Sequence, residues 1–440
     1  MLIAAVSCKG EEPKPIWPIF IEIKTTPGKQ DTLLANVAGV SYKMMDAAIK
    51  LRASLRSDLN YRSGIYVYDS KSVTTYLDNP GKLAARITLL GLKDVYLSAS
   101  KGSIDGSDVV RRNWIRDFNK AAHLYGLTVW ALRLFSTSAY VSDAAVTDEC
   151  AKILAYNQAV TSNEKFDAVS ADWEPHVLKE GGADTPAGLL YFWDSNTNYG
   201  IGKSNDLLLK RTLDMFAIAK QNLGNLMINE AIHYMYQNNY NSGLLSYGNT
   251  LQFLINCEYV TVMCYTDTKE KVWSRGLSPV EAATGKTKKV SICVKTSLNT
   301  YGDGGDTSTS LYPKGWDYLI ESMNYFYSQG AVKPAFRGID FFEFEGLEQM
   351  WNTTDASTKI SGQSISKGSI SYDSQKETLQ IDNFSSPVLV LLYSVNGNLI
   401  LKKEITNLEK ISINQLPRGN YLVKYICATD SSRTLKLIKK

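Results

Sequence analysis

The chain has 440 residues, which exceeds the size at which a single core usually keeps growing and predicts one large domain with a smaller one. Its 48 basic and 44 acidic side chains leave a net charge of +4, so the charge does not indicate a nucleic-acid-binding protein. Six scattered cysteines without a CxxC pair and three separated histidines indicate neither a disulfide framework nor a metal site, and we expect no cofactor.

The N-terminus carries a short apolar run that ends in Ala5-Val6-Ser7-Cys8 and is followed by charged residues and prolines. This pattern resembles the end of a bacterial lipoprotein signal, in which the cysteine is lipidated, and it makes Cys8 a lipidation candidate. The run is short and no basic segment precedes it, so a chance Ser-Cys pair is the alternative.

Between about residues 60 and 350, short apolar runs alternate with helical stretches, which indicates a parallel α/β arrangement. Eight runs over this length favour an eight-stranded (β/α)8 TIM barrel over a doubly wound sheet, which usually carries a glycine-rich first loop. Such barrels place their chemistry at the C-terminal ends of the strands, so polar residues there are the site candidates. The predicted strands are Gly64–Tyr68, Val95–Ala99, Thr128–Leu134, Ala168–Asp172, Leu226–Glu230, Tyr259–Tyr265, Val290–Lys295 and Gly338–Phe344.

The fourth predicted strand ends in two carboxylates that stand two residues apart, Asp172 and Glu174. Because alternate residues of a strand point to the same side, these two side chains share one face. Two carboxylates this close cannot both ionise easily, so one pKa should rise and provide a general acid near neutral pH. The alternative is a strand end whose acids cap a helix or pair with Arg or Lys.

The same stretch resembles the DGxDxDxE signature of family 18 glycoside hydrolases, in which a Trp often precedes the Glu. The motif's glycine is Ala168 here and its middle Asp is Ser170. The resemblance implies a chitinase or endo-β-N-acetylglucosaminidase acting on glycans that contain N-acetylglucosamine, with retention of configuration. The substrate's own 2-acetamido oxygen would be the nucleophile, Glu174 the acid and base, and Asp172 the group that orients the acetamide. The matching positions are Asp167, Asp172, Trp173 and Glu174.

Two later strands carry further positions that match this family. After the sixth strand, Met263 and Tyr265 fit a Met-x-Tyr segment that implies substrate contact, with Tyr265 bonding the acetamide oxygen. Asp267 is displaced by one residue from the acid of that segment. At the end of the eighth strand, Phe342 stands where the family usually has the Trp that floors the pocket. For Tyr265 the alternative is an ordinary core-facing tyrosine.

The loop after the fourth strand is rich in aromatic residues, among them Tyr191 and Trp193. Their flat rings suit stacking on sugars, and we expect them to contact the substrate. The alternative is that they fold back on the barrel and pack there.

From about residue 361 the composition shifts to Ser, Lys, Thr and Asn, and short alternating runs separated by turn signals predict a small antiparallel sandwich. This part resembles the C-terminal sorting domains of the type IX secretion system of Bacteroidetes, in Tyr393 with Asn396-Gly397 and in Leu416-Pro417-x-Gly419-x-Tyr421. The resemblance implies export to the cell surface, the outer membrane or the extracellular space. The expected divisions are a signal-like segment over 1–15, the barrel over 16–355, a linker over 356–372 and the sandwich over 373–440.

Three other functions stay open. A hydrolase with a nucleophilic Glu on strand seven is disfavoured, because that strand reads VSICVKTS and ends without a carboxylate. A catalytically silent carbohydrate-binding barrel on the cell surface is favoured by Ser170, Phe342 and the displaced Asp267. A purely structural envelope protein would need neither sugar binding nor Glu174. In each case we expect a monomer.

Overall fold

The computed structural model describes residues 29–56, 61–68, 75–195, 202–298, 306–356, 369–373, 376–382, 388–394, 399–405, 410–427 and 432–439. The chain divides into two compact units, residues 1–358 and 359–440. The expected signal-like segment and the lipidation candidate Cys8 lie outside the described residues. In the part of the chain described here, no helix has the length and apolar character needed to cross a membrane.

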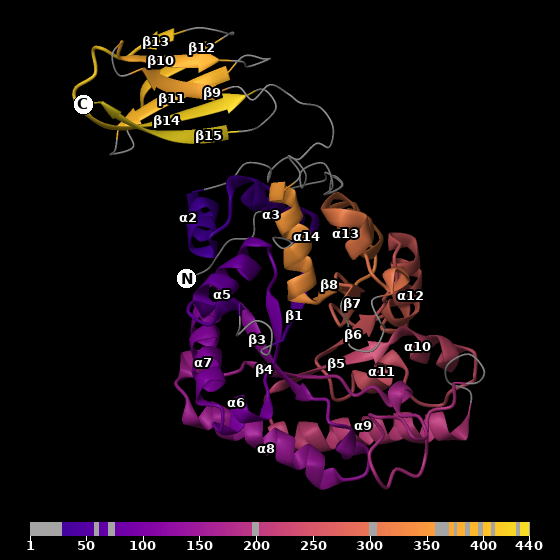
Figure 1. The fold of residues 1–440 in the computed structure, drawn as a ribbon. Helices are drawn as coiled ribbons and strands as arrows, with labels where there is room; N and C mark the ends of the chain where they lie inside the picture. The colour runs from indigo at the N-terminus through magenta and orange to yellow at the C-terminus, as the bar shows by residue number, and fades with distance from the viewer. Residues whose placement is uncertain are drawn as a thin grey trace, which may run out of the picture. The chain divides into compact units, whose positions relative to one another are not determined.

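Eight parallel strands of the first unit pair in chain order and close into a barrel (Figure 1). Closure is made by β8 pairing with β1, with Gly64 opposite Asp340. The predicted TIM barrel is thereby confirmed, and the doubly wound alternative is wrong. The strands are β1 Gly64–Tyr68, β2 Asp94–Ser98, β3 Thr128–Leu134, β4 Ala168–Ala171, β5 Met227–His233, β6 Tyr259–Met263, β7 Val290–Lys295 and β8 Phe336–Phe342.

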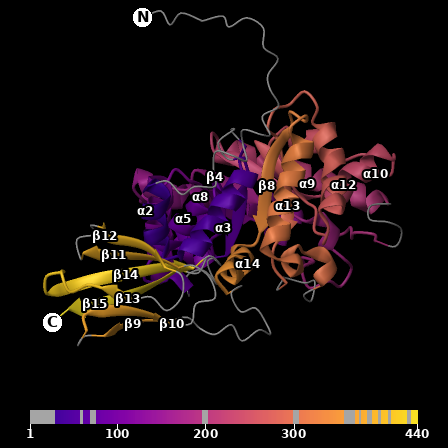
Figure 2. The same ribbon diagram turned by 90° about the horizontal axis from the view of Figure 1, so that it is seen from above.

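Helices lie outside the ring of strands (Figures 1 and 2). Several begin at a side chain that caps the first turn, as where Asn79 accepts from the amide of Lys82 and Asp108 from that of Arg111. They are α2 Lys29–Ala38, α3 Tyr42–Ser54, α5 Pro80–Leu89, α6 Lys101–Asp105, α7 Val109–Leu124, α8 Asp143–Ala159, α9 Lys203–Leu223, α10 Tyr234–Asn241, α11 Thr250–Phe253, α12 Lys269–Ala282, α13 Gly315–Gly330 and α14 Phe344–Ala356. Their apolar faces and the outward side chains of the strands form one continuous core.

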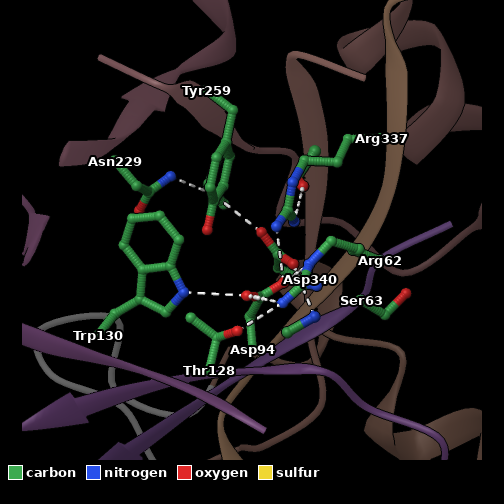
Figure 3. A network of polar contacts seen from close by, with 12 residues as sticks. Arg62, Ser63, Asp94, Thr128, Trp130, Asn229, Tyr259, Arg337 and Asp340 are labelled. Carbon is green, nitrogen blue, oxygen red and sulfur yellow. Dashed lines mark hydrogen bonds and ion pairs between the residues drawn. The ribbon is translucent and has the colours of Figure 1, made fainter. Parts of the chain in front are cut away.

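Buried charges fill part of the barrel interior (Figure 3). Asp94 accepts from Arg337 at 2.6 Å and from Arg62 at 2.7 Å. Asp340 accepts from the Tyr96 hydroxyl at 2.9 Å. Burial by itself would raise the pKa of Asp94, but the two guanidinium groups hold it below its ordinary value. The network is therefore a satisfied set of buried ions.

Removing one partner from this network should destabilise the barrel. We expect Asp94→Asn to lower the free energy of unfolding by about 3–5 kcal/mol, because the buried Arg337 guanidinium loses its counter-charge. Urea denaturation followed by tryptophan fluorescence measures this loss. Asp214→Asn is the matched control, since Asp214 pairs with Lys210 on the surface, where about 0.2–1 kcal/mol is expected. Equal losses in both variants would contradict the prediction.

The second unit consists of two antiparallel sheets, ordered β13-β10-β9 and β12-β11-β14-β15. Leu379 and Ile411 of the first sheet share a buried cluster with Val390 and Val423 of the second, so the two sheets pack as the predicted sandwich. The strands are β9 Ser369–Asp373, β10 Thr378–Asp382, β11 Val388–Ser394, β12 Leu399–Ile405, β13 Lys410–Ser412, β14 Gly419–Cys427 and β15 Ser432–Lys439. β9 begins within the residues that the sequence assigned to a linker.

The Leu-Pro-x-Gly-x-Tyr segment has a structural explanation in this unit. The Tyr421 hydroxyl donates to the carbonyl of Pro417 at 2.6 Å, which closes the turn before β14. The Lys439 amine is buried and donates to the carbonyls of Ile413, Asn414 and Leu416. The motif thus holds a turn and the closing strand together.

Candidate active site

Asp172 and Glu174 follow β4 directly at the C-terminal end of the barrel. Ser170 points into the barrel, where its hydroxyl donates to Asn229 at 2.9 Å. Alternation then places Asp172 and Glu174 on the same inner face. The amide of Asp172 still donates to the carbonyl of Leu134 in β3, at 2.9 Å, so the strand ladder fixes its backbone.

The surroundings of the two carboxyls favour their protonated forms. Oδ1 of Asp172 is buried and has no hydrogen-bond partner among the described residues. Burial raises the pKa of Asp172 to about 6. Burial, then the neighbouring charges of Asp172 and Asp184, raise the pKa of Glu174 well above its ordinary value. Within the described residues, no lysine or arginine pairs with either carboxyl; His176 is the one basic neighbour, at 3.5 Å from Glu174.

This arrangement can act as a proton donor beside a carboxylate. The acid of higher pKa holds its proton to a higher pH, while its neighbour ionises first and can stabilise positive charge. The alternative of acids paired with Arg or Lys finds no support in these contacts.

Aromatic rings lie beside the carboxyls on the inner face. Tyr265 and Phe342 have ring centroids 5.5 Å apart, and Phe342 also contacts Tyr66 at 5.8 Å and Tyr68 at 6.1 Å. Burial raises the pKa of Tyr265, with Cys293, Tyr66 and Asp172 contributing. The structure thus brings Tyr265 and Phe342 to the same region as Asp172. Tyr66 and Tyr68 were not predicted as site residues. They are aromatic residues at alternate positions near the end of β1, and this pattern indicates that both lie on one face of the strand.

Three of the residues named from the sequence are held by contacts with other parts of the barrel. Asp167 precedes β4, at the opposite end of the barrel, and accepts from the amide of Val129 at 2.7 Å and from His123 at 2.9 Å. Trp173 is 2% exposed and points outward onto Phe216 of α9, with ring centroids 4.9 Å apart. Trp193 is also buried and packs on Tyr236, at 5.8 Å, so it folds back on the barrel.

The remaining predicted residues have mixed positions. Met263 ends β6 and is 7% exposed. Asp267 follows β6 and lies 3.6 Å from the amine of Lys271. Tyr191 is exposed on the loop after β4. Their roles stay predictions.

Glu230 of β5 is a further acid close to the site. It points outward, is fully buried, and neither carboxyl oxygen reaches hydrogen-bonding geometry with a described residue. Burial first, then Asp172, raises its pKa well above the ordinary value. A carboxylate at the end of the predicted fifth strand was its signal in the sequence.

Ser170, which stands where the signature of family 18 glycoside hydrolases has an Asp, begins a hydrogen-bonded chain. Asn229 accepts from Ser170 and donates to the Thr261 hydroxyl at 3.0 Å. Thr261 in turn donates to Asp340 at 2.8 Å. The chain links the site region with the buried charges shown in Figure 3.

A cavity of about 350 Å³ opens beside the ends of β7 and β8. Its lining residues come from the segments that follow these two strands and from α14. The lining is Ser297, Leu298, Tyr312, Glu343, Glu345, Gly346 and Gln349. Among the described residues, no group of three or more His, Cys, Asp or Glu side chains is placed to hold a metal ion.

These features define a protein whose candidate site lies on a (β/α)8 barrel, and comparison with known proteins shows that it is exported. Residues 373–440 match the family described as "Secretion system C-terminal sorting domain". The expected sorting domain is thereby confirmed, and the chain is directed to the cell surface or the extracellular space. None of the curated proteins is similar enough to the chain to match it.

Several solved structures are remotely similar. A GH18 chitinase from Pseudoalteromonas aurantia is 12% identical over 68% of this chain and 99% of that chain, with a TM-score of 0.43. An endo-beta-N-acetylglucosaminidase from Cordyceps militaris is 10% identical over 76% and 98%, with a TM-score of 0.39. The spore cortex-lytic enzyme SleL from Bacillus megaterium is 10% identical over 67% and 73%, with a TM-score of 0.40. These likenesses are too remote to bear on activity.

Proposed function

We propose that this chain is an exported glycoside hydrolase that cleaves β-linked glycans at an N-acetylglucosamine unit, as in chitin-type oligosaccharides or the core of N-linked glycans. The observation that carries the proposal is the pair Asp172 and Glu174, which lies at the C-terminal end of the barrel with raised pKa values and has no Arg or Lys partner among the described residues. The family 18 signature around these residues supplies the chemistry.

In this mechanism Glu174 protonates the glycosidic oxygen. The acetamido oxygen of the substrate attacks the anomeric carbon and gives an oxazolinium ion, whose charge the Asp172 carboxylate stabilises. The Tyr265 hydroxyl would hold the acetamide. Glu174, now a carboxylate, removes a proton from a water molecule. This water attacks the anomeric carbon, which opens the oxazolinium ring and gives net retention of configuration.

The experiment compares substrates that carry the acetamide with a cello-oligosaccharide that lacks it. We expect N-acetyl-chito-oligosaccharides or a high-mannose glycoprotein to be cleaved with retention, which NMR of the released anomer shows. A cello-oligosaccharide, which has a hydroxyl in place of the acetamide, should stay intact because it lacks the internal nucleophile. Cleavage of the cello-oligosaccharide at an equal rate would contradict the mechanism.

A catalytically silent carbohydrate-binding barrel is the second candidate. It is favoured by Ser170, whose hydroxyl is committed to Asn229 instead of supporting the acid pair, and by Phe342 in place of the family's Trp. Binding of N-acetyl-chito-oligosaccharides by calorimetry without any cleavage would establish this function.

A further inference from the structure

Glu174 has a neighbour on its own loop that the proposed reaction does not yet use. His176 lies in a 3-10 turn over Pro175–Val177, and its Nε2 is 3.5 Å from Oε1 of Glu174. Its Nδ1 lies 2.6 Å from the hydroxyl oxygen of Tyr236, in the first turn of α10. The imidazole therefore bridges the proposed acid and a tyrosine hydroxyl.

Packing holds this ring in one place. The rings of His233, Tyr236 and Trp193 surround it, with centroids 4.8, 5.8 and 6.3 Å away. Burial first, then His233 and Lys179, lowers the pKa of His176 well below its ordinary value. For His233, burial and the Arg275 guanidinium lower the pKa to about 4. Both imidazoles are therefore neutral near neutral pH.

A neutral imidazole carries one proton, and Tyr236 determines which nitrogen carries it. Nε2 faces the Glu174 carboxyl, whose oxygens accept hydrogen bonds once the group is ionised. The Tyr236 hydroxyl can donate its proton to Nδ1, which lies 2.6 Å from its oxygen. With Nδ1 accepting, the ring proton resides on Nε2, which faces Glu174.

We propose that His176 is a positioning residue for Glu174: Tyr236 fixes the tautomer in which Nε2–H points at the Glu174 carboxyl and stabilises the carboxylate formed when the proton leaves. This inference rests on the proposed function. A neutral donor suits a group that must be acid in one step and base in the next. A lysine or arginine in this place would hold Glu174 ionised throughout, and would remove the acid.

The tautomer can be measured without any substrate. The chain has 3 histidines, so nitrogen-15 NMR of the full chain labelled at histidine gives few signals, and those lost in His176→Gln belong to His176. We expect a protonated Nε2 and a bare Nδ1 in the wild type, and a mixture of tautomers in Tyr236→Phe. A wild-type His176 protonated on Nδ1 would overturn the proposal, whether or not glycans are cleaved. The expected tautomer in a chain that cleaves no glycan would support the hydrogen-bond assignment while refuting the proposed function.

Kinetics test the role in catalysis. His176→Phe keeps a ring but removes the donor, and we expect kcat to fall about tenfold with little change in KM. The basic limb of the pH profile should move to higher pH, because the Glu174 carboxylate loses a donor. His176→Gln keeps an N–H and should recover part of the loss. Equal losses in both variants with an unmoved pH profile would indicate a merely structural role and overturn the proposal. The other titratable groups that face Glu174, all retained in these variants, are Asp172, Asp184, Glu230, Tyr140 and Tyr236.

Discussion

Glu174→Gln should lower kcat on an N-acetyl-chito-oligosaccharide by about 10²–10⁴ while leaving substrate binding nearly unchanged. Glutamine keeps the volume of the side chain but can neither protonate the glycosidic oxygen nor take a proton from water. In the wild type, burial and the charges of Asp172 and Asp184 raise the pKa of Glu174 well above its ordinary value, which favours the protonated acid. Steady-state kinetics and calorimetric binding on the same substrate measure the two effects.

Glu180→Gln is the matched control, because Glu180 is exposed on the same loop. Its turnover should equal that of the wild type. If Glu174→Gln were as active as the wild type, Glu174 would have no part in the reaction. If neither protein turned over substrate but both bound it, the carbohydrate-binding barrel would be the better account.

Asp172→Asn should lower kcat by about 10²–10³. It should also change the stability of the barrel relative to the wild type, and this change should be more favourable at alkaline pH than at acid pH. Oδ1 of Asp172 is buried without a hydrogen-bond partner among the described residues, and burial raises the pKa of the carboxyl to about 6. The unfolded chain ionises this group at about 3.9. The folded state thus prefers the protonated carboxyl.

The sign of the pH dependence follows from this difference. The contribution of Asp172 to stability is fully present below about pH 4 and is lost as the pH rises through about 6. Above that pH the wild type holds an ionised carboxyl against the cost of burial, and Asn does not. We expect the stability difference between variant and wild type to be more favourable by on the order of 1–2 kcal/mol at about pH 8 than at about pH 4.

Urea denaturation at the two pH values gives this difference directly and needs no substrate. The same requirement for an ionised Asp172 should make kcat/KM of the wild type fall below about pH 6. If the stability difference between variant and wild type were equal at both pH values, or more favourable to the variant at acid pH, burial would not raise the pKa of Asp172.

The strands of the barrel could be predicted from the sequence because each is a short apolar run between helical stretches. The strand boundaries were predicted less well. The predicted eighth strand extends to Phe344, whereas β8 ends at Phe342 and α14 begins at Phe344. β9 was missed because its Ser-Ile-Ser-Tyr-Asp run has only two apolar residues in a polar stretch. Such a strand is specified by its partner β10 more than by its own composition.

The site could be predicted in part. Strand alternation was sufficient to place Asp172 and Glu174 on one face. The same rule, applied to Trp173, predicts the outward position that the structure shows, and the place of Asp167 before β4 assigns it to the opposite end of the barrel. The sequence could not supply two tertiary features. These are the fold of the loop that buries Trp193, and the contact between His176 and Tyr236, which are 60 residues apart in the chain.

The hydrogen-bonded chain that starts at Ser170 limits how this protein could accept the Asp that the family 18 signature has at this position. An Asp at position 170 would present only acceptor oxygens to Oδ1 of Asn229, which now accepts from Ser170. Turning the Asn229 amide would relieve this conflict, but its oxygen would then compete with Asp340 for the hydroxyl proton of Thr261. A single Ser170→Asp substitution would therefore disturb the hydrogen bond between Thr261 and Asp340, which belongs to the network of buried ions. Such a substitution would need a compensating change at Asn229 or Thr261 first.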